Sequence, residues 1–255
     1  MNQQQVQHLK RFGVWTMTGN SIMVESLARS GAQFLGIDFQ HGFMGFEAVA
    51  QAIQIANLCQ MRTFVRLSAA EHVAWVPRVL DAGADGIIAA MVSGVDDVRR
   101  VVDATRYQPH GTRSYGGWRY GLRPEPEDPR QIPVEVHVQV ETPAAVEAAP
   151  SIAQVSGVAG IYLGPVDLAL ALSHDYPRQW GDPAWESATE RVLNACREYK
   201  LISGTFAVSG SEAWKLINHG FDDVVVSSDV AMLRQTVDKQ LKIAQGGREE
   251  TEDKS

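Results

Sequence analysis

Short apolar runs alternate along this chain with segments in which apolar residues recur at the spacing of a helix. The apolar runs predict eight strands, at Gly13–Met17, Phe34–Asp38, Thr63–Arg66, Gly86–Ala90, Val134–Val140, Gly160–Leu163, Ser203–Val208 and Asp223–Val226. Continuous apolar strands that alternate with helices indicate a parallel sheet covered on both faces. Eight such units favour a closed (β/α)8 TIM barrel over an open doubly wound sheet. We therefore expect one domain over 1–245, followed by a polar tail at 246–255.

One stretch, Tyr107–Pro133, interrupts this alternation. It is rich in proline, glycine and arginine, and it is too long for an ordinary connection between two elements. Its aromatic residues Tyr115, Trp118 and Tyr120 favour an ordered loop, because aromatic side chains in loops usually dock on the protein. We expect this loop to lie over the mouth of the barrel, where Trp118 would contact the substrate.

Composition narrows the class of protein. A hydrophobic content of 45% supports a large core, and a net charge of −7 argues against a nucleic-acid or anionic-membrane partner. No basic-then-apolar signal peptide opens the chain, and no apolar run approaches the roughly 20 residues of a membrane span. Cys59 and Cys196 lie in separate helical segments and are expected to be unpaired thiols, which predicts a cytoplasmic protein.

Several expected strands end in residues that carry chemistry. Phe34–Asp38 leads into His41, which places a carboxylate and a general base at the carboxyl end of the barrel, although His41 could instead cap the next helix on the surface. Arg66 ends the next strand and could hold a carboxylate or an enolate oxygen, or form a structural ion pair. Asp81 ends a helical segment, where the helix dipole disfavours a carboxylate, so we expect another residue to compensate it.

Two further strands each stop at a carboxylate. Glu141 follows Val134–Val140, and Asp167 follows Gly160–Leu163 within the phrase Gly164-Pro165-Val166-Asp167. Two neighbouring carboxylates repel each other unless a cation lies between them, and oxygen ligands favour Mg²⁺ or Mn²⁺, with Co²⁺ as a further candidate. Asp167 could alternatively act only as a helix cap. Gln139 points to the same side of its strand as Glu141 and could hydrogen-bond a ligand oxygen.

These motifs together resemble the HpcH/HpaI family of class II, metal-dependent pyruvate aldolases. The resemblance rests on Asp38-Phe39-Gln40-His41, Val65-Arg66, Ala104-Thr105-Arg106-Tyr107 with Gly111-Thr112-Arg113, Gln139-Val140-Glu141-Thr142 and Gly164-Pro165-Val166-Asp167-Leu168, which occur in the family's order between Phe12 and Leu241. It implies a (β/α)8 barrel, commonly a homohexamer built from dimers that exchange their last helix.

The resemblance also implies roles for individual residues. Glu141 and Asp167 would bind the metal, and Gln139 with the backbone of Gly164, Pro165, Val166 and Asp167 would hold pyruvate. His41 would be the base, made more basic by Asp38 and, across a subunit boundary, by Asp81, while Arg66 would stabilise the enolate. The substrates would be pyruvate and an aldehyde, related by cleavage or formation of a 4-hydroxy-2-oxo acid.

Two departures and three alternatives accompany this interpretation. Many relatives carry Glu where this chain has Gln40, and they have smaller residues in place of 113–120, which suggests a distinct pocket for an aromatic or anionic aldehyde. The same enolate chemistry would serve an oxaloacetate-type decarboxylase. A CoA-ester lyase usually needs a longer chain, and a binding protein would be free to lose His41, Arg66, Glu141 or Asp167.

Overall fold

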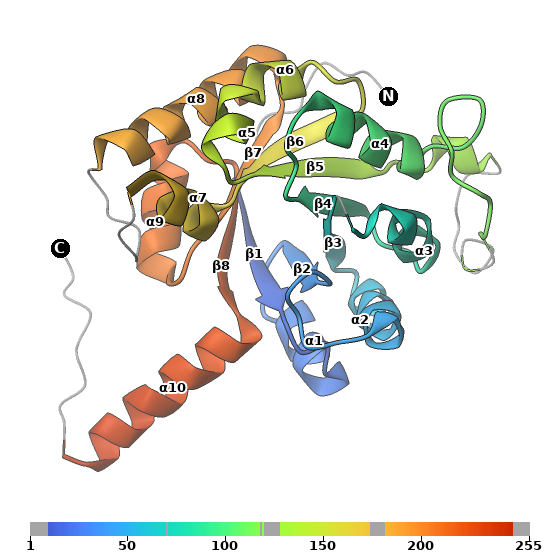
Figure 1. Cartoon of the computed structure of the whole chain (residues 1–255). Coiled ribbons are helices and arrows are strands. Elements are labelled where there is room, and N and C mark those ends of the chain that lie inside the picture. Colours follow the sequence, from blue (N-terminus) through green and yellow to red (C-terminus); the bar gives the residue numbers. More distant parts are fainter. Residues whose placement is uncertain (1–9, 70, 118, 120–127, 174–181, 247–255) are drawn as a thin grey trace.

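Eight parallel strands close into a barrel in the computed structural model (Figure 1). The structure describes residues 10–69, 71–117, 119, 128–173 and 182–246. Each strand pairs with the next along the chain, and β8 pairs with β1. The strands are β1 Arg11–Thr16, β2 Phe34–Asp38, β3 Arg62–Ser68, β4 Gly86–Ala90, β5 Glu135–Val140, β6 Val158–Leu163, β7 Ile202–Phe206 and β8 Asp223–Ser228.

The predicted (β/α)8 barrel is thus confirmed, and each predicted strand overlaps an observed one. β2 and β4 have the predicted bounds, and the other strands differ by one or two residues at an end. β3, for example, continues two residues beyond Arg66 to Ser68, because its last residues pair with Ala89 and Ala90 of β4. The apolar pattern therefore located the strands, and pairing with neighbours set their ends.

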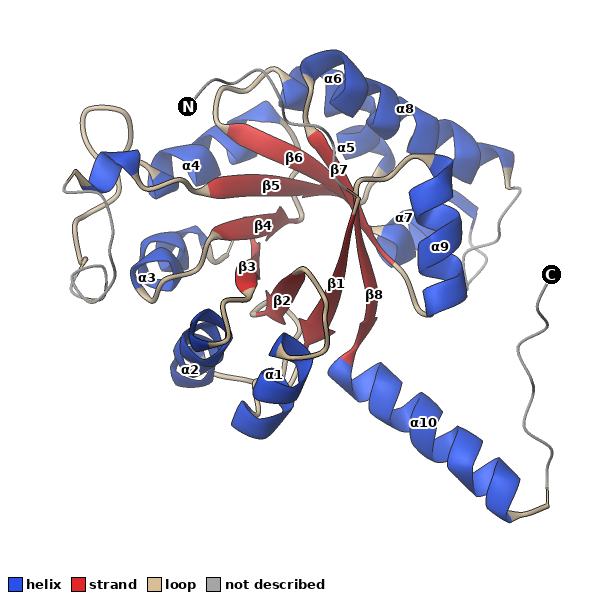
Figure 2. Cartoon of the chain, turned by 180° about the vertical axis from the view of Figure 1, so that it is seen from behind, coloured by secondary structure: helices blue, strands red, loops and turns tan. Residues whose placement is uncertain are grey.

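Helices cover the outside of the barrel (Figure 2). They are α1 Ser21–Ala28, α2 Phe46–Leu58, the short 3-10 helix η1 Val73–Trp75, α3 Val76–Asp81, α4 Val95–Thr105, the 3-10 helix η3 Pro129–Gln131, α5 Pro143–Glu147, α6 Ala149–Ala153, α7 Pro165–Ser173, α8 Pro183–Tyr199, α9 Gly210–His219 and α10 Asp229–Ala244. A large apolar core fills the space between these helices and the sheet.

A second, smaller core fills the interior of the barrel. It consists of the buried side chains Trp15, Phe34, Phe64, Ile88, Tyr162 and Val225. Gly36 makes room for the largest of them, since a Cβ atom there would lie 2.0 Å from the Trp15 indole. This apolar plug separates the carboxyl-terminal mouth of the barrel from its amino-terminal end, as expected for a barrel that is a packed core and not a pore.

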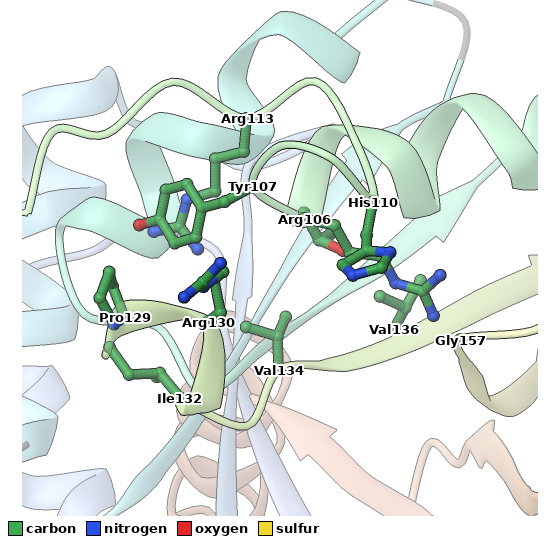
Figure 3. A pocket seen from close by; sticks show the side chains of 11 residues that line it. Arg106, Tyr107, His110, Arg113, Pro129, Arg130, Ile132, Val134, Val136 and Gly157 are labelled. Carbon is green, nitrogen blue, oxygen red and sulfur yellow. The ribbon is translucent and has the colours of Figure 1, made fainter. Parts of the chain in front are cut away.

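The described ends of the long loop lie at the other end of the barrel from the one predicted. Helix α4 returns the chain to the amino-terminal end, so the connection from α4 to β5 begins and ends there. Residues of 106–113 and 129–134 line a cavity with Val136 of β5 and with Gly157, which precedes β6 (Figure 3). The predicted position over the mouth is wrong for these parts, and Trp118 lies outside the described residues.

Helix α10 extends away from the barrel (Figures 1 and 2). Its one buried residue is Asp229 in the first turn, whereas four apolar residues, Val230, Leu233, Val237 and Leu241, are 41–56% exposed. These four positions share one face of the helix, because they are spaced by three or four residues. The described helix thus presents an apolar stripe that its own barrel does not cover.

Other expectations concern single residues and the tail. Cys59 and Cys196 are both free thiols, as predicted. None of the helices in the described ranges combines the length and the apolar character that a membrane crossing needs. Of the predicted polar tail, only Gly246 is among the described residues.

Candidate active site

A cavity of about 360 Å³ opens at the carboxyl-terminal mouth of the barrel. Its polar lining brings together five residues that the sequence singled out, from the ends of β2, β3, β5 and β6: Asp38, His41, Arg66, Gln139 and Asp167. Gly164, Pro165 and Val166 also line it. Carboxyl ends of parallel strands converge at this end of a barrel, and active sites of TIM-barrel enzymes lie there.

Asp38 and Arg66 form a bidentate ion pair at the base of the cavity. The Arg66 Nε and Nη2 atoms donate to the two Asp38 carboxylate oxygens at 3.2 and 2.5 Å. Burial by itself would raise the pKa of Asp38, but the Arg66 charge and hydrogen bonds outweigh it and lower that pKa below its usual range. Trp15 adds a hydrogen bond to Asp38, and its ring faces the guanidinium at 5.3 Å. Arg66 is therefore fixed in a charged, oriented state beside the cavity.

His41 lies on the exposed rim of the cavity. Asp38 Oδ1 accepts hydrogen bonds from the backbone N–H groups of Gln40 and His41 at 3.1 and 3.0 Å, which fixes the turn that carries the imidazole. Within the described residues no hydrogen bond joins Asp38 to the imidazole itself. Asp38 thus positions His41 through the main chain, while its side-chain partner is Arg66.

Glu141 is a deeply buried carboxylate, only 2% exposed, directly after β5. One oxygen accepts the Met91 backbone N–H at 2.7 Å, and the other accepts the Gln139 amide at 2.5 Å. Burial raises the pKa of Glu141, and the nearby charge of Asp167 adds to this rise, against the opposite effect of the two hydrogen bonds and of Arg66. The local environment, mainly burial, therefore disfavours the charged form of this carboxyl group.

The start of α7 supplies the neighbouring part of the site. The Gly164 N–H donates to the Val140 carbonyl at 2.9 Å, and Pro165 has no N–H, so these two residues offer a ligand no backbone donor. Val166 and Asp167 follow in the first turn, where helical N–H groups lack partners within the helix. A Cβ atom at position 164 would lie 2.6 Å from the Glu141 carboxylate, so glycine lets β5 and α7 approach here.

The two carboxylates fit a hard divalent cation. Among the described residues no group of three or more His, Cys, Asp or Glu side chains could hold a metal ion. Glu141 and Asp167 could supply two oxygen ligands, and Mg²⁺ is usually held by one or two carboxylates together with waters and substrate oxygens. The raised pKa of Glu141 beside Asp167 is the electrostatic strain that such a cation would relieve.

Part of the lining of the cavity is apolar or aromatic, and sequence reasoning missed it. These residues are Trp15 of β1, Met17 just after β1, Tyr162 of β6 and Phe206 of β7. Met91 was also missed, although its φ of +59° directs its N–H to Glu141 in a backbone conformation that residues other than glycine seldom adopt. Neither signal could be found in the sequence, because these side chains carry no distinctive chemistry.

Asp81 is not part of this cavity. It ends α3, on the return of the chain toward the amino-terminal end, and its carboxylate accepts a hydrogen bond from Arg113 at 2.6 Å. Arg113 is the compensating partner expected for an acidic residue at a helix end. Gly116 packs against the same carboxylate, since a Cβ atom there would lie 2.4 Å from it.

The fold and the mouth cavity define a barrel enzyme with an acidic site at the carboxyl ends of its strands. The model of the HpcH/HpaI aldolase/citrate lyase family matches residues 11–236, and the chain therefore belongs to this family. It is a carbon–carbon lyase, as the family description and the names of its relatives indicate.

Two relatives and one solved structure illustrate the similarity. The chain is 29% identical to 2-keto-3-deoxy-L-rhamnonate aldolase of Salmonella gallinarum, over 91% of this chain and 87% of the relative. It is 27% identical to the enzyme of the same name from Klebsiella pneumoniae, over 96% and 92% of the two chains. The crystal structure of an HpcH/HpaI aldolase/citrate lyase family protein from Burkholderia cenocepacia superposes with a TM-score of 0.83 at 28% identity, covering 93% of this chain and 95% of that one.

Proposed function

We propose that this protein is a divalent-metal-dependent aldolase that cleaves a 4-hydroxy-2-oxo acid to pyruvate and an aldehyde, or catalyses the reverse addition. The observation that carries the proposal is the buried Glu141 carboxylate, which lies beside Asp167 and close to Arg66 and Gln139 at the barrel mouth. The relatives named above support it, because a 2-keto-3-deoxy acid aldolase acts on a 2-oxo acid.

Glu141 and Asp167 would hold the cation, with Mg²⁺ or Mn²⁺ preferred to Co²⁺ for an oxygen-only site. A bound cation supplies Lewis-acid polarisation of the 2-oxo group. Gln139 and the backbone N–H groups of Val166 and Asp167 would bind the carboxylate of pyruvate. Gln139, Val166 and Asp167 line the mouth cavity, and the Gln139 amide donates to Glu141 at 2.5 Å.

The remaining steps belong to Arg66 and His41. In cleavage, His41 would accept the proton of the 4-hydroxyl group as the C3–C4 bond breaks, and the aldehyde would leave. The electron pair of that bond passes to the pyruvate enolate, whose oxygen Arg66 would stabilise through the N–H groups that Asp38 does not use. Return of that proton from His41 to C3, directly or through water, then gives pyruvate and restores the base.

The exposed apolar residues of α10 suggest that the chain forms an oligomer. The uncovered apolar stripe of α10 (Val230, Leu233, Val237 and Leu241) is matched by exposed apolar side chains on two other helices, Ile22 of α1 and Trp214 of α9. We infer that α10 docks on a second copy of this chain, and the family resemblance makes the expected assembly a homohexamer. The role of Asp81 across a subunit boundary stays a prediction, as does a cytoplasmic location, which the two free thiols support.

Exchange of the pyruvate methyl protons in D2O, followed by NMR, tests the chemistry without an acceptor aldehyde. We expect exchange with Mg²⁺ or Mn²⁺, loss of exchange with a chelator, and a decrease of about 10²-fold or more in Arg66→Lys. Arg62→Lys is the matched control, because Arg62 lies on the same strand at the amino-terminal end and pairs with Glu135. Absence of exchange in folded, metal-loaded wild type would exclude pyruvate as the nucleophile and favour decarboxylation of a larger 2-oxo acid.

Light scattering after gel filtration tests the assembly. We expect Leu233→Glu to reduce the oligomer to smaller species, because it places a charge in the buried apolar contact. Lys239→Glu, on the same helix but outside the stripe, should leave the mass unchanged. A monomeric wild type, or equal behaviour of the two variants, would contradict the inferred docking of α10.

A further inference from the structure

A second cavity, of about 330 Å³, lies at the amino-terminal end of the barrel (Figure 3). It is formed by the end of α4, the described part of the following loop, η3, the start of β5 and the residue before β6. Its described lining residues are Thr105, Arg106, Tyr107, His110, Arg113, Pro129, Arg130, Ile132, Val134, Val136 and Gly157. It shares none of them with the mouth cavity. The proposed aldolase chemistry does not use it.

The polar part of this lining is basic. It comprises three arginines, His110, Tyr107 and Thr105, and the described lining residues include neither Asp nor Glu. In Figure 3, Tyr107 and Arg113 lie on one side with Arg130, while His110 and Arg106 lie on the other. The Arg113 guanidinium also faces the Tyr107 ring, at 4.7 Å from its centre.

The three arginines differ in how their charge is balanced. Arg113 pairs with Asp81 and Arg130 with Asp128, at 2.6 and 2.7 Å, and neither of these carboxylates lines the cavity. Arg106 instead donates to the neutral carbonyl of Ser156 at 3.0 Å. No ion pair of Arg106 with an acidic side chain occurs within the described ranges, so it brings a full positive charge to the cavity.

The backbone is shaped to admit this guanidinium. Gly157 adopts a φ of +107°, and a Cβ atom there would lie 2.0 Å from Arg106 Nη2. Any other residue at this position would displace the arginine. The glycine thus lets the charged group lie against the chain just before β6, at the edge of the cavity.

The rest of the lining is apolar. Pro129, Ile132, Val134 and Val136 provide a surface for the body of a ligand, and the cavity is within the range of volumes typical of small-molecule sites. We propose that this cavity binds a small organic oxyanion, a carboxylate or a phosphate monoester, with its charged group on Arg106 and His110 and its apolar body on the start of β5. The ligand binds without entering the mouth cavity.

Calorimetric titration of the full chain with phenyl phosphate, benzoate and inorganic phosphate tests this site. We expect phenyl phosphate or benzoate to bind at one site per chain, and Arg106→Gln to weaken that binding by about tenfold or more, because a charge-assisted hydrogen bond is lost. His110→Gln should weaken it by about threefold. The matched control is Arg99→Gln, which removes an exposed arginine of α4 that pairs with Asp96 and does not line the cavity, and it should change affinity by less than about twofold.

Two further comparisons make the result decisive. Arg66→Lys, altered only in the mouth cavity, should bind the probe like the wild type, and weaker binding there would place the ligand in the mouth. Circular dichroism checks that each variant is folded. If Arg106→Gln does not fold, the weaker binding expected for His110→Gln becomes the test of the site. The proposal is overturned if none of the three probes binds, if Arg99→Gln weakens binding as much as Arg106→Gln, or if inorganic phosphate binds as tightly as phenyl phosphate. The organic probe that binds more tightly identifies the ligand class: phenyl phosphate indicates a phosphate monoester, and benzoate indicates a carboxylate.

Discussion

The two ends of the barrel interior differ in how the charges of their carboxylates are balanced by cationic side chains. At the amino-terminal end, Arg11 pairs with Asp223 at 2.5 Å and Arg62 with Glu135 at 2.7 Å, and His137 contacts Glu135 at 3.1 Å. Burial disfavours a charged Glu135, but the contacts with His137 and Arg62 outweigh it and hold the pKa of that carboxyl far below its usual range. Each carboxylate in this network has a cationic partner.

At the mouth the balance is different. Among the described residues that line the mouth cavity, Arg66 is the one arginine, and its ion pair is with Asp38. The pKa of Glu141 is raised. The comparison separates a balanced network of charges, which closes one end of the barrel, from a mouth whose buried carboxylate has no cationic side chain bonded to it, where we propose that a cation binds.

The largest expected effect comes from Glu141→Gln. It removes a proposed metal ligand and keeps the side-chain shape, so metal-dependent turnover should fall by at least about 10²-fold with the fold intact. Steady-state kinetics over a range of Mn²⁺ concentrations, with circular dichroism, would measure this. Glu135→Gln makes the same chemical change at the amino-terminal end and should retain activity. Turnover that survives both Glu141→Gln and a chelator would contradict the metal assignment.

The next comparison uses one substitution at both ends. Asp38→Asn removes the ionic partner of the largely buried Arg66 and should lower the free energy of unfolding by about 3 kcal/mol. Asp223→Asn should lower it by less, because Arg11 keeps a second ionic partner, Glu135, at 3.6 Å. Urea denaturation measures these losses. Only Asp38→Asn should also decrease kcat, because Asp38 orients Arg66 and the backbone of His41. Equal losses of kcat in the two variants would show that the effect on activity comes through stability alone.

The smallest effect is a difference in pH dependence, measured as thermal stability in the presence of a chelator. Because the folded-state pKa of Glu135 is depressed, its contribution is present above its ordinary pKa of 4.5 and is lost as the pH falls below it. Glu135→Gln should therefore reduce the decrease in thermal stability at acid pH. The raised pKa of Glu141 has the opposite sign, since it disfavours the folded state above that pKa. Glu141→Gln should therefore be more stable than the wild type at neutral pH, and metal should not stabilise it further.

The sequence alone determined the barrel and the residues at its mouth. Alternation of apolar runs with helical periodicity gives the order of elements, and parallel strands must end at one edge, so Asp38, Arg66, Glu141 and Asp167 had to converge. The same connectivity places the loop after α4 at the amino-terminal end. The aromatic content of that loop had indicated an ordered loop, and we expected it over the mouth, but composition does not decide which end a connection occupies.

Only the tertiary structure decided which partner each of these polar groups contacts. It shows that Asp38 binds Arg66 and not the His41 imidazole, that Met91 in a left-handed conformation donates to Glu141, and that Arg113 holds Asp81. Each contact joins residues from different strands or loops, and its geometry depends on how strands are staggered around the barrel. Local sequence patterns specify which way a side chain faces, whereas the partner it meets is set by the closure of the whole sheet.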